Sequence, residues 1–323
     1  MNSVMNSNIV VLFLFLGLLF NSCEKEENLS SAKDAYIVAY NVLVDSESDN
    51  YDIFTIDPES QATENISGNP DVAWIYNSFG SKITYRSDKD TCSRCFYLYQ
   101  MDIDGSNDRQ ITDFRLRDSW MGFRNNGKEL IVSPHETIDS LFYIIDLNGQ
   151  ILNKLNTGLA YAADPAFSPD GNKVAFRGAH KRSKREEGFD GEIYIINEDG
   201  TGLTKLTEYP ETDRTAPWYA YRAGPPQWHP QENFISYASY QNGKYSLYGV
   251  STDGSDNWKL TNNSQSEVYH NWSPDGNWLV TDMSDTSETK YQIGLVNWKT
   301  KDLTVLTDTI YKYQQSPVFI VKN

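Results

Sequence analysis

A block of 15 residues occurs six times along this chain, and this repeat limits the fold more than any other feature of the sequence. Each block has an apolar stretch, a polar turn that usually carries Asp or Asn and Gly, and a short second stretch that mostly ends in Leu-Thr or Ile-Thr. Successive blocks start 45, 44, 51, 54 and 46 residues apart. Repetition at such a period indicates structural units that stack on one another. The blocks span residues 53–67, 98–112, 142–156, 193–207, 247–261 and 293–307.

A second pattern lies before most of the blocks and predicts two strands joined by a tight turn. In two copies it reads Ser-Pro-Asp-Gly-Asn directly after an aromatic residue. Pro169 and Pro274 suit the second position of a type I turn, because proline fixes φ near the value that this position needs. Gly171 and Gly276 suit the fourth position of the same turns. Each repeat therefore holds four short strands, named a to d in chain order.

Strand c of the fourth repeat (Ile193–Ile196) is apolar or aromatic at every position, which indicates burial on both faces. Such a strand needs a sheet packed against each side, and blades stacked around an axis supply this. The first repeat lacks a strand a, whereas residues 314–323 read as a strand a with no strand b after it. We therefore predict an all-β, six-bladed propeller of four-stranded antiparallel blades, closed by the C-terminal strand.

The overall charge narrows the choice of partners. The chain has 44 Asp and Glu residues against 28 Lys and Arg residues. An acidic surface repels nucleic-acid phosphates, so we expect no nucleic-acid partner. We expect the propeller to be monomeric.

The N-terminal stretch predicts export and a lipid anchor. The apolar run Ile9–Phe20 has 12 residues, so a helix of it would be too short to span a bilayer. It reads as the core of a cleaved signal peptide over residues 1–22. The cysteine behind it resembles the lipobox of bacterial lipoproteins, which implies lipidation of Cys23 and an outer-membrane location, facing the periplasm or the medium. The alternative is a plain secretory signal that leaves Cys23 free. A polar tether (23–33) would then precede the propeller domain (34–323).

The stretches PAFSPDGNKVAF and EIYIINEDGTGLTKLT resemble the WD40-like (PD40) repeat of TolB-type β-propellers. The resemblance covers the chain from about Asp34 to Asn323 and implies the propeller fold. TolB itself carries an additional N-terminal α/β domain, for which we find no corresponding segment. Peptidases with related propellers carry a hydrolase domain with a G-x-S-x-G elbow, and this sequence contains no such motif, so their activity is not carried over.

The long loops are expected on one face of the ring. If strand a is innermost, the a–b and c–d turns share one face, and the b–c and d–a loops share the other. Binding sites usually lie where long loops surround a rigid scaffold. The long insertions at 86–95, 177–191 and 208–226 are all b–c or d–a loops. We call their side the loop-rich face.

Cys92 and Cys95 lie in the first of these insertions. A structural disulfide is the main interpretation, because disulfides form readily in exported proteins. A redox pair would need a helix N-terminus, and a zinc site would need two further ligands. We therefore expect neither a metal nor another cofactor.

The other two insertions supply the candidate ligand contacts. One is a basic cluster that suits a carboxylate-bearing ligand, although a solvated charged loop is the alternative. The other is aromatic and suits a sugar or a peptide, although a loop packed over the blades is the alternative. His270 is added because three other blades have proline at its position. The candidates are Arg177, His180, Lys181, Arg182, Arg185, Trp218, Tyr219, Tyr221, Arg222 and His270.

These features predict a non-catalytic envelope lipoprotein that binds an envelope protein or peptide, or an acidic glycan. We identify no catalytic residue. The alternative is a metal-dependent polysaccharide lyase acting on uronic acid polymers. It rests on His135, His180 and His270, which are expected on one face and invite comparison with oligogalacturonate lyases.

Overall fold

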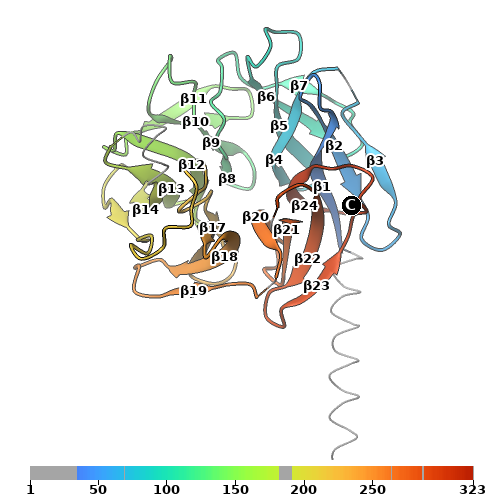
Figure 1. The fold of residues 1–323 in the computed structure, drawn as a ribbon. Helices are drawn as coiled ribbons and strands as arrows, with labels where there is room; N and C mark the ends of the chain where they lie inside the picture. The colour runs from blue at the N-terminus through green and yellow to red at the C-terminus, as the bar shows by residue number, and fades with distance from the viewer. Residues whose placement is uncertain (1–34, 69, 182–190, 263, 286, 323) are drawn as a thin grey trace, which may run out of the picture.

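The chain forms a ring of six four-stranded sheets (Figure 1). The computed structural model describes residues 35–322 apart from 69, 182–190, 263 and 286. All neighbouring strands within a sheet run antiparallel, which confirms the predicted six-bladed propeller. Within the described part of the chain, no helix has the length and apolarity needed to cross a membrane.

The strands of each blade follow the predicted order from the axis outward. Blade 1 contains β24 (Gln314–Val321), β1 (Tyr36–Asp45), β2 (Asn50–Ile56) and β3 (Thr63–Asn65). Blade 2 contains β4 (Ala73–Phe79), β5 (Lys82–Ser87), β6 (Tyr97–Asp102) and β7 (Arg109–Gln110). Blade 3 contains β8 (Gly122–Arg124), β9 (Glu129–Val132), β10 (Phe142–Asp146) and β11 (Ile151–Leu155). Blade 4 contains β12 (Tyr161–Phe167), β13 (Lys173–Ala179), β14 (Glu192–Asn197) and β15 (Thr204–Lys205). Blade 5 contains β16 (Gln227–Trp228), β17 (Phe234–Gln241), β18 (Lys244–Ser251) and β19 (Asn257–Lys259). Blade 6 contains β20 (Ser266–Trp272), β21 (Trp278–Ser284), β22 (Tyr291–Asn297) and β23 (Asp302–Val305).

The C-terminal strand closes the ring as predicted. β24 pairs with β1 in antiparallel register, with Tyr36 opposite Val321 and Val38 opposite Phe319. β24 also packs between the inner strands β20 and β4 of the two flanking blades. The first blade is thus built from both ends of the propeller, and its inner strand forms only when the C-terminal segment is in place.

The Ser-Pro-Asp-Gly turns have the predicted geometry. The backbone N–H of Gly171 donates to the carbonyl of Ser168 at 2.8 Å, and Gly276 donates to Ser273 at the same distance. Both glycines have φ near +70°, at +74° and +70° respectively, a region that favours glycine. These turns are therefore architectural elements on the face opposite the long loops.

The core lies between the blades. In β14, Ile193 packs toward blade 5 with Ile235 and Val250, whereas Ile196 packs toward blade 3 with Ile144. Burial of successive residues on opposite faces explains why strand c lacks alternation in the sequence. Apolar contact between neighbouring blades therefore holds the ring together.

Two strands extend further than the sequence indicated. We expected the long b–c loops to begin at residues 86 and 177, but β5 continues through Arg86 and Ser87, and β13 continues from Arg177 to Ala179. A charged residue normally argues against a buried strand. Here Arg177 pairs with the buried carboxylate of Asp164, and Arg86 lies 2.9 Å from the exposed carboxylate of Asp118.

Candidate functional site

Aromatic side chains meet at the axis of the ring. Trp120 precedes the inner strand of blade 3, and Tyr269 lies in the inner strand of blade 6, so the two come from opposite sides of the ring. Their ring centroids are 4.5 Å apart. Tyr76 from blade 2 contacts Trp120 edge-on at 5.3 Å, and Tyr221 lies 6.5 Å from Tyr269. Aromatic rings from several blades therefore meet near the axis.

Bulges in the inner strands turn some of these side chains toward the axis. The pairing of the a and b strands shifts by one residue in several blades, because the a strand carries one extra residue between the shifted pairs. The bulged segments include Tyr76 in β4, Asp164 in β12 and Tyr269 in β20.

Polar side chains of the b strands hold these bulges and link neighbouring blades. The backbone N–H of Ile75 in blade 2 donates to Oδ1 of Asn41 in blade 1 at 2.7 Å. Asp282 of blade 6 accepts from the N–H of Tyr269 at 2.9 Å and from the N–H of Ser316, in blade 1, at 3.1 Å. Burial raises the pKa of Asp282 to about 7, against the opposing effect of these donors. Hydrogen bonds of these buried polar side chains therefore connect neighbouring blades.

Arg177, expected on the exposed rim, is instead part of this buried framework. Only 6% of the residue is exposed. Its Nε donates to Oδ2 of Asp164 at 2.8 Å, and Nη2 lies 2.7 Å from the same oxygen. Its guanidinium lies over the ring of Tyr221 at 4.5 Å and near that of Tyr161 at 5.6 Å. The buried carboxylate draws Arg177 inward, so this prediction of an exposed contact was wrong, and Tyr221 packs over the same ion pair.

Arg86 occupies the corresponding place in blade 2, and the sequence reasoning missed it. The stretches KITYR and KVAFR occupy equivalent b strands, and both end in arginine. This similarity could have indicated that Arg86 and Arg177 occupy equivalent positions. Arg86 is 7% exposed and lies over the ring of Phe96 at 4.2 Å. Its Nη1 lies 2.9 Å from Oδ1 of Asp118, whose side chain is 72% exposed.

A groove on the loop-rich face brings together three other candidates. Two adjoining pockets, of about 380 and 320 Å³, share Tyr209 and Arg222 among their lining residues. His180 and Lys181 line the larger pocket. We call the two pockets together the blade 4–5 groove, because their walls come from these two blades. The other charged lining residues are Glu192, Lys205, Glu208, Glu211, Asp213, Arg214 and Lys259.

Hydrogen bonds fix the floor of the blade 4–5 groove. Glu192 accepts from the hydroxyl of Thr207 at 2.5 Å and from the backbone N–H of Tyr209 at 2.8 Å. Burial raises the pKa of Glu192, against these two donors. The guanidinium of Arg222 lies 5.5 Å from the centroid of the Tyr209 ring. The groove thus presents a cation above an aromatic ring, next to a partly buried carboxylate.

Trp218 and Tyr219 lie on the same loop as Arg222, but they are not lining residues of these two pockets. Their exposed fractions are 42% and 55%, and their rings contact edge-on at 5.5 Å. The loop is anchored to blade 5, because the N–H of Asn242 donates to Asp213 at 2.8 Å. These two side chains are therefore both partly exposed on this loop.

His270 does not reach the rim, which corrects the expectation that it could contact a ligand there. It lies in β20 and is 5% exposed. Its Nε2 is 2.7 Å from the hydroxyl oxygen of Ser236 in blade 5. Burial lowers the pKa of His270 to about 4, so the ring is neutral at physiological pH. His270 therefore joins blades 5 and 6.

The histidines do not form a metal site. Within the described ranges, no three His, Cys, Asp or Glu side chains are grouped so that they could hold a metal ion. His135 is partly buried and bonds locally to Thr137, whereas His229 packs among aromatic rings on the opposite face. The described residues therefore do not provide the ligand set that a metal-dependent lyase would require.

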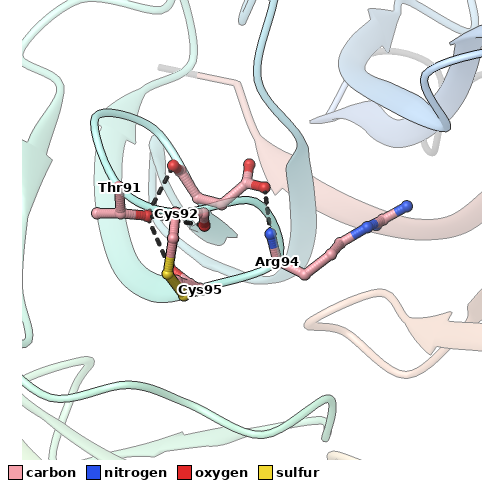
Figure 2. The surroundings of a disulfide bond; sticks show 5 residues. Thr91, Cys92, Arg94 and Cys95 are labelled. Atoms are coloured by element: carbon pink, nitrogen blue, oxygen red, sulfur yellow. Dashed lines mark hydrogen bonds between the residues drawn. A yellow bond between two sulfur atoms is a disulfide. The ribbon is translucent and has the colours of Figure 1, made fainter.

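The structure contains the disulfide between Cys92 and Cys95, with their Cα atoms 5.2 Å apart. Figure 2 shows how the loop is held: the hydroxyl of Thr91 donates to the carbonyl oxygens of Asp88 and Cys95, and the N–H of Arg94 donates to the Asp88 carboxylate. The guanidinium of Arg94 forms an ion pair with Asp49 of blade 1. The loop thus connects two neighbouring blades.

Three candidates, Cys23, Arg182 and Arg185, lie outside the described residues.

No protein-family model matches the chain. Among solved structures, a protein described as TolB from Agrobacterium tumefaciens superposes with a TM-score of 0.63 over 89% of this chain and 97% of that one, at 14% identity. The fold is that of a TolB-type propeller. The oligogalacturonate lyase of Vibrio parahaemolyticus is a more distant neighbour of this TolB-type propeller, with a TM-score of 0.50 over 84% of this chain and 78% of that one, at 14% identity.

One curated sequence relative shares a part of the TolB-type propeller. The alpha subunit of hydrazine synthase from Kuenenia stuttgartiensis is 37% identical over 81 residues. The match covers 25% of this chain and 9% of that subunit. A match over so small a share of that subunit shows no shared activity.

Proposed function

We propose that this protein is a non-catalytic envelope lipoprotein whose loop-rich face binds a polypeptide segment in the blade 4–5 groove. The observation that carries the proposal is Arg222 lying over Tyr209 beside the partly buried carboxylate of Glu192. A cation on an aromatic ring beside a fixed acceptor offers a peptide both a packing surface and hydrogen bonds.

The charge of the groove favours a peptide over an acidic glycan. Its walls carry both signs: the cations are Lys181, Lys205, Arg214, Arg222 and Lys259, and the carboxylates are Glu192, Glu208, Glu211 and Asp213. A uronic acid polymer carries a negative charge on every sugar, so it would meet repulsion from the carboxylates. A peptide can alternate charges and match both signs.

The location in the proposal rests on the sequence alone. The apolar run Ile9–Phe20 followed by Cys23 supports lipidation and an outer-membrane anchor, on either side of that membrane. A mass measurement of the mature chain tests it. A lipidated N-terminal Cys23 is expected, whereas a mature chain with an unmodified Cys23 would refute the anchor.

The second function considered, a polysaccharide lyase, receives no support from the geometry. Of its proposed histidines, His270 is buried and joins blades 5 and 6, and His135 bonds locally to Thr137. The likeness to the Vibrio lyase shows a shared architecture.

Binding of the full chain to arrays of mixed-charge peptides and of acidic glycans tests the groove. The variant combines Lys181→Ala and Arg222→Ala. A matched control combines Lys128→Ala and Lys299→Ala, which removes the same charge from the opposite face. We expect the groove variant to lose about tenfold or more in affinity for bound peptides, about 1.4 kcal/mol, and the control to lose none.

Two results would refute the proposal. Equal peptide binding by the two variants would place the ligand elsewhere. Binding of acidic glycans alone would show that the ligand class is wrong.

A further inference from the structure

Blades 2 and 4 carry the same arginine but not the same counter-ion. Arg86 and Arg177 end equivalent stretches of their b strands, and each lies beside a bulge in the neighbouring a strand. In blade 4 the bulge supplies Asp164, which is 2% exposed and pairs with Arg177. In blade 2 the bulge supplies Tyr76. Blade 2 therefore keeps the buried cation without the buried carboxylate.

The guanidinium of Arg86 is poorly satisfied for a group so deeply buried. Its Nε and Nη1 have no well-aligned hydrogen-bond acceptor among the described residues. Nη1 lies 2.9 Å from Asp118, which is close enough for an ion pair although the alignment is poor. Desolvating a charged group costs several kcal/mol unless it is paired and hydrogen-bonded. Two N–H groups of the Arg86 guanidinium thus lack a well-aligned acceptor among the described residues.

Asp118 is a weak and replaceable partner. Its side chain is 72% exposed, so solvent screens its attraction for Arg86. It lies in the d–a loop that joins β7 of blade 2 to β8 of blade 3. Tyr76, whose hydroxyl donates to Asp118 at 2.8 Å, would remain beside any carboxylate that took its place. A ligand oxygen could therefore replace the Asp118 oxygen on the same two donors.

We propose that Arg86 anchors a second ligand site at the axis, which takes a single carboxylate of a peptide in place of Asp118. The guanidinium packs against the rings of Phe96 and Tyr76, at 4.2 and 5.5 Å from their centroids, and this packing restricts its orientation before a ligand arrives. A preorganised arginine can bind a carboxylate through two parallel hydrogen bonds.

The surrounding rings favour a peptide carboxylate over a uronic acid. A sugar ring stacks on an open aromatic face, but Trp120 and Tyr269 at this axis are packed against each other at 4.5 Å. Asp118 stays nearby after it is displaced and would repel the next charge of a polyanion. This site is separate from the blade 4–5 groove, so either can fail without the other.

Thermal unfolding of the full chain, at constant ionic strength, tests the site. The probe is N-acetyl-glutamate α-amide, with N-acetyl-glutamine amide as its uncharged analogue and galacturonate as the sugar carboxylate. At about ten times its Kd, the glutamate probe should raise the Tm by roughly 2–4 °C, and the other two compounds should not. Arg86→Met should abolish the shift, and Lys299→Met on the opposite face should retain it.

A second variant keeps the test valid if Arg86→Met does not fold. Asp118→Asn removes the competing carboxylate from an exposed position, so it should bind the glutamate probe several-fold more tightly than the unmodified chain. An unchanged Tm with the glutamate probe would overturn the proposal, as would a shift that persists in Arg86→Met. Equal affinity in Asp118→Asn would show that Arg86 is not the anchor. A shift with galacturonate alone would overturn the peptide assignment.

Discussion

The buried ion pair of blade 4 offers a quantitative test of how the axis is held together. Asp164 and Arg177 are 2% and 6% exposed, and two guanidinium nitrogens lie within 2.8 Å of one carboxylate oxygen. The other oxygen accepts the backbone N–H of Trp120 at 3.0 Å, so the pair also links blades 3 and 4. Removing one partner leaves the other charge buried without compensation, which costs about 3–5 kcal/mol.

Two single variants and their combination separate the ion pair from its surroundings. Asp164→Asn retains an acceptor for Trp120 and tolerates the backbone at this position, where φ is +59°. We expect Asp164→Asn and Arg177→Met each to lower the free energy of unfolding by about 3 kcal/mol or more. The double variant should lose less than the sum, by about 2 kcal/mol, because neither charge remains.

Guanidinium chloride unfolding, followed by both tryptophan fluorescence and circular dichroism, measures these free energies. Coincident transitions in the two signals establish that the comparison is valid. Losses that add within about 0.5 kcal/mol would refute the reasoning, because they would mean that the two side chains do not interact energetically. A loss below about 1 kcal/mol in either single variant would show that the buried charge finds another partner or reaches solvent.

Two further variants test other parts of the ring. The pKa of His270 in the folded protein is about 4, below its ordinary 6.5, so the folded state binds fewer protons and stability falls as the pH drops below 6.5. His270→Gln should therefore lose about 2 kcal/mol less than the unmodified protein between pH 7 and pH 5; an equal loss in chemical denaturation would contradict the buried, neutral ring. Replacing Cys92 and Cys95 together by serine should cost about 2 kcal/mol, the chain-entropy value for so short a loop. If the unfolding free energy does not change, the disulfide has no structural role.

The repeat in the sequence was enough to predict the blade number and the closure of the ring. A turn such as Ser168–Gly171 depends on residues within a few positions of one another, so its chemistry can be read locally. The closure could be read because the missing first strand and the extra last strand, β24, complement each other. Interblade burial left a clear signal in strand c, where Ile193 and Ile196 face opposite sheets.

The candidate site could be predicted only in part, because loop composition does not tell which way a side chain points. Lys181 and Arg222 lie in loops about 40 residues apart in sequence and meet in one groove only through the packing of blades 4 and 5. Arg177 and His270 are residue types that often contact ligands. Both are buried here, because Asp164 and Ser236 approach them from other strands. Arg86 was overlooked for the same reason.

The sequence by itself determined the propeller fold. Strand pattern, turn chemistry and repeat length are local properties, and each of them recurs in most of the repeats. The tertiary structure decided which polar side chains face inward. The bulges of the inner strands turn Tyr76, Asp164 and Tyr269 toward the axis, where residues from different blades come within bonding distance. Whether an arginine there is neutralised, as Arg177 is, or left with unused donors, as Arg86 is, depends on the single residue at the neighbouring bulge.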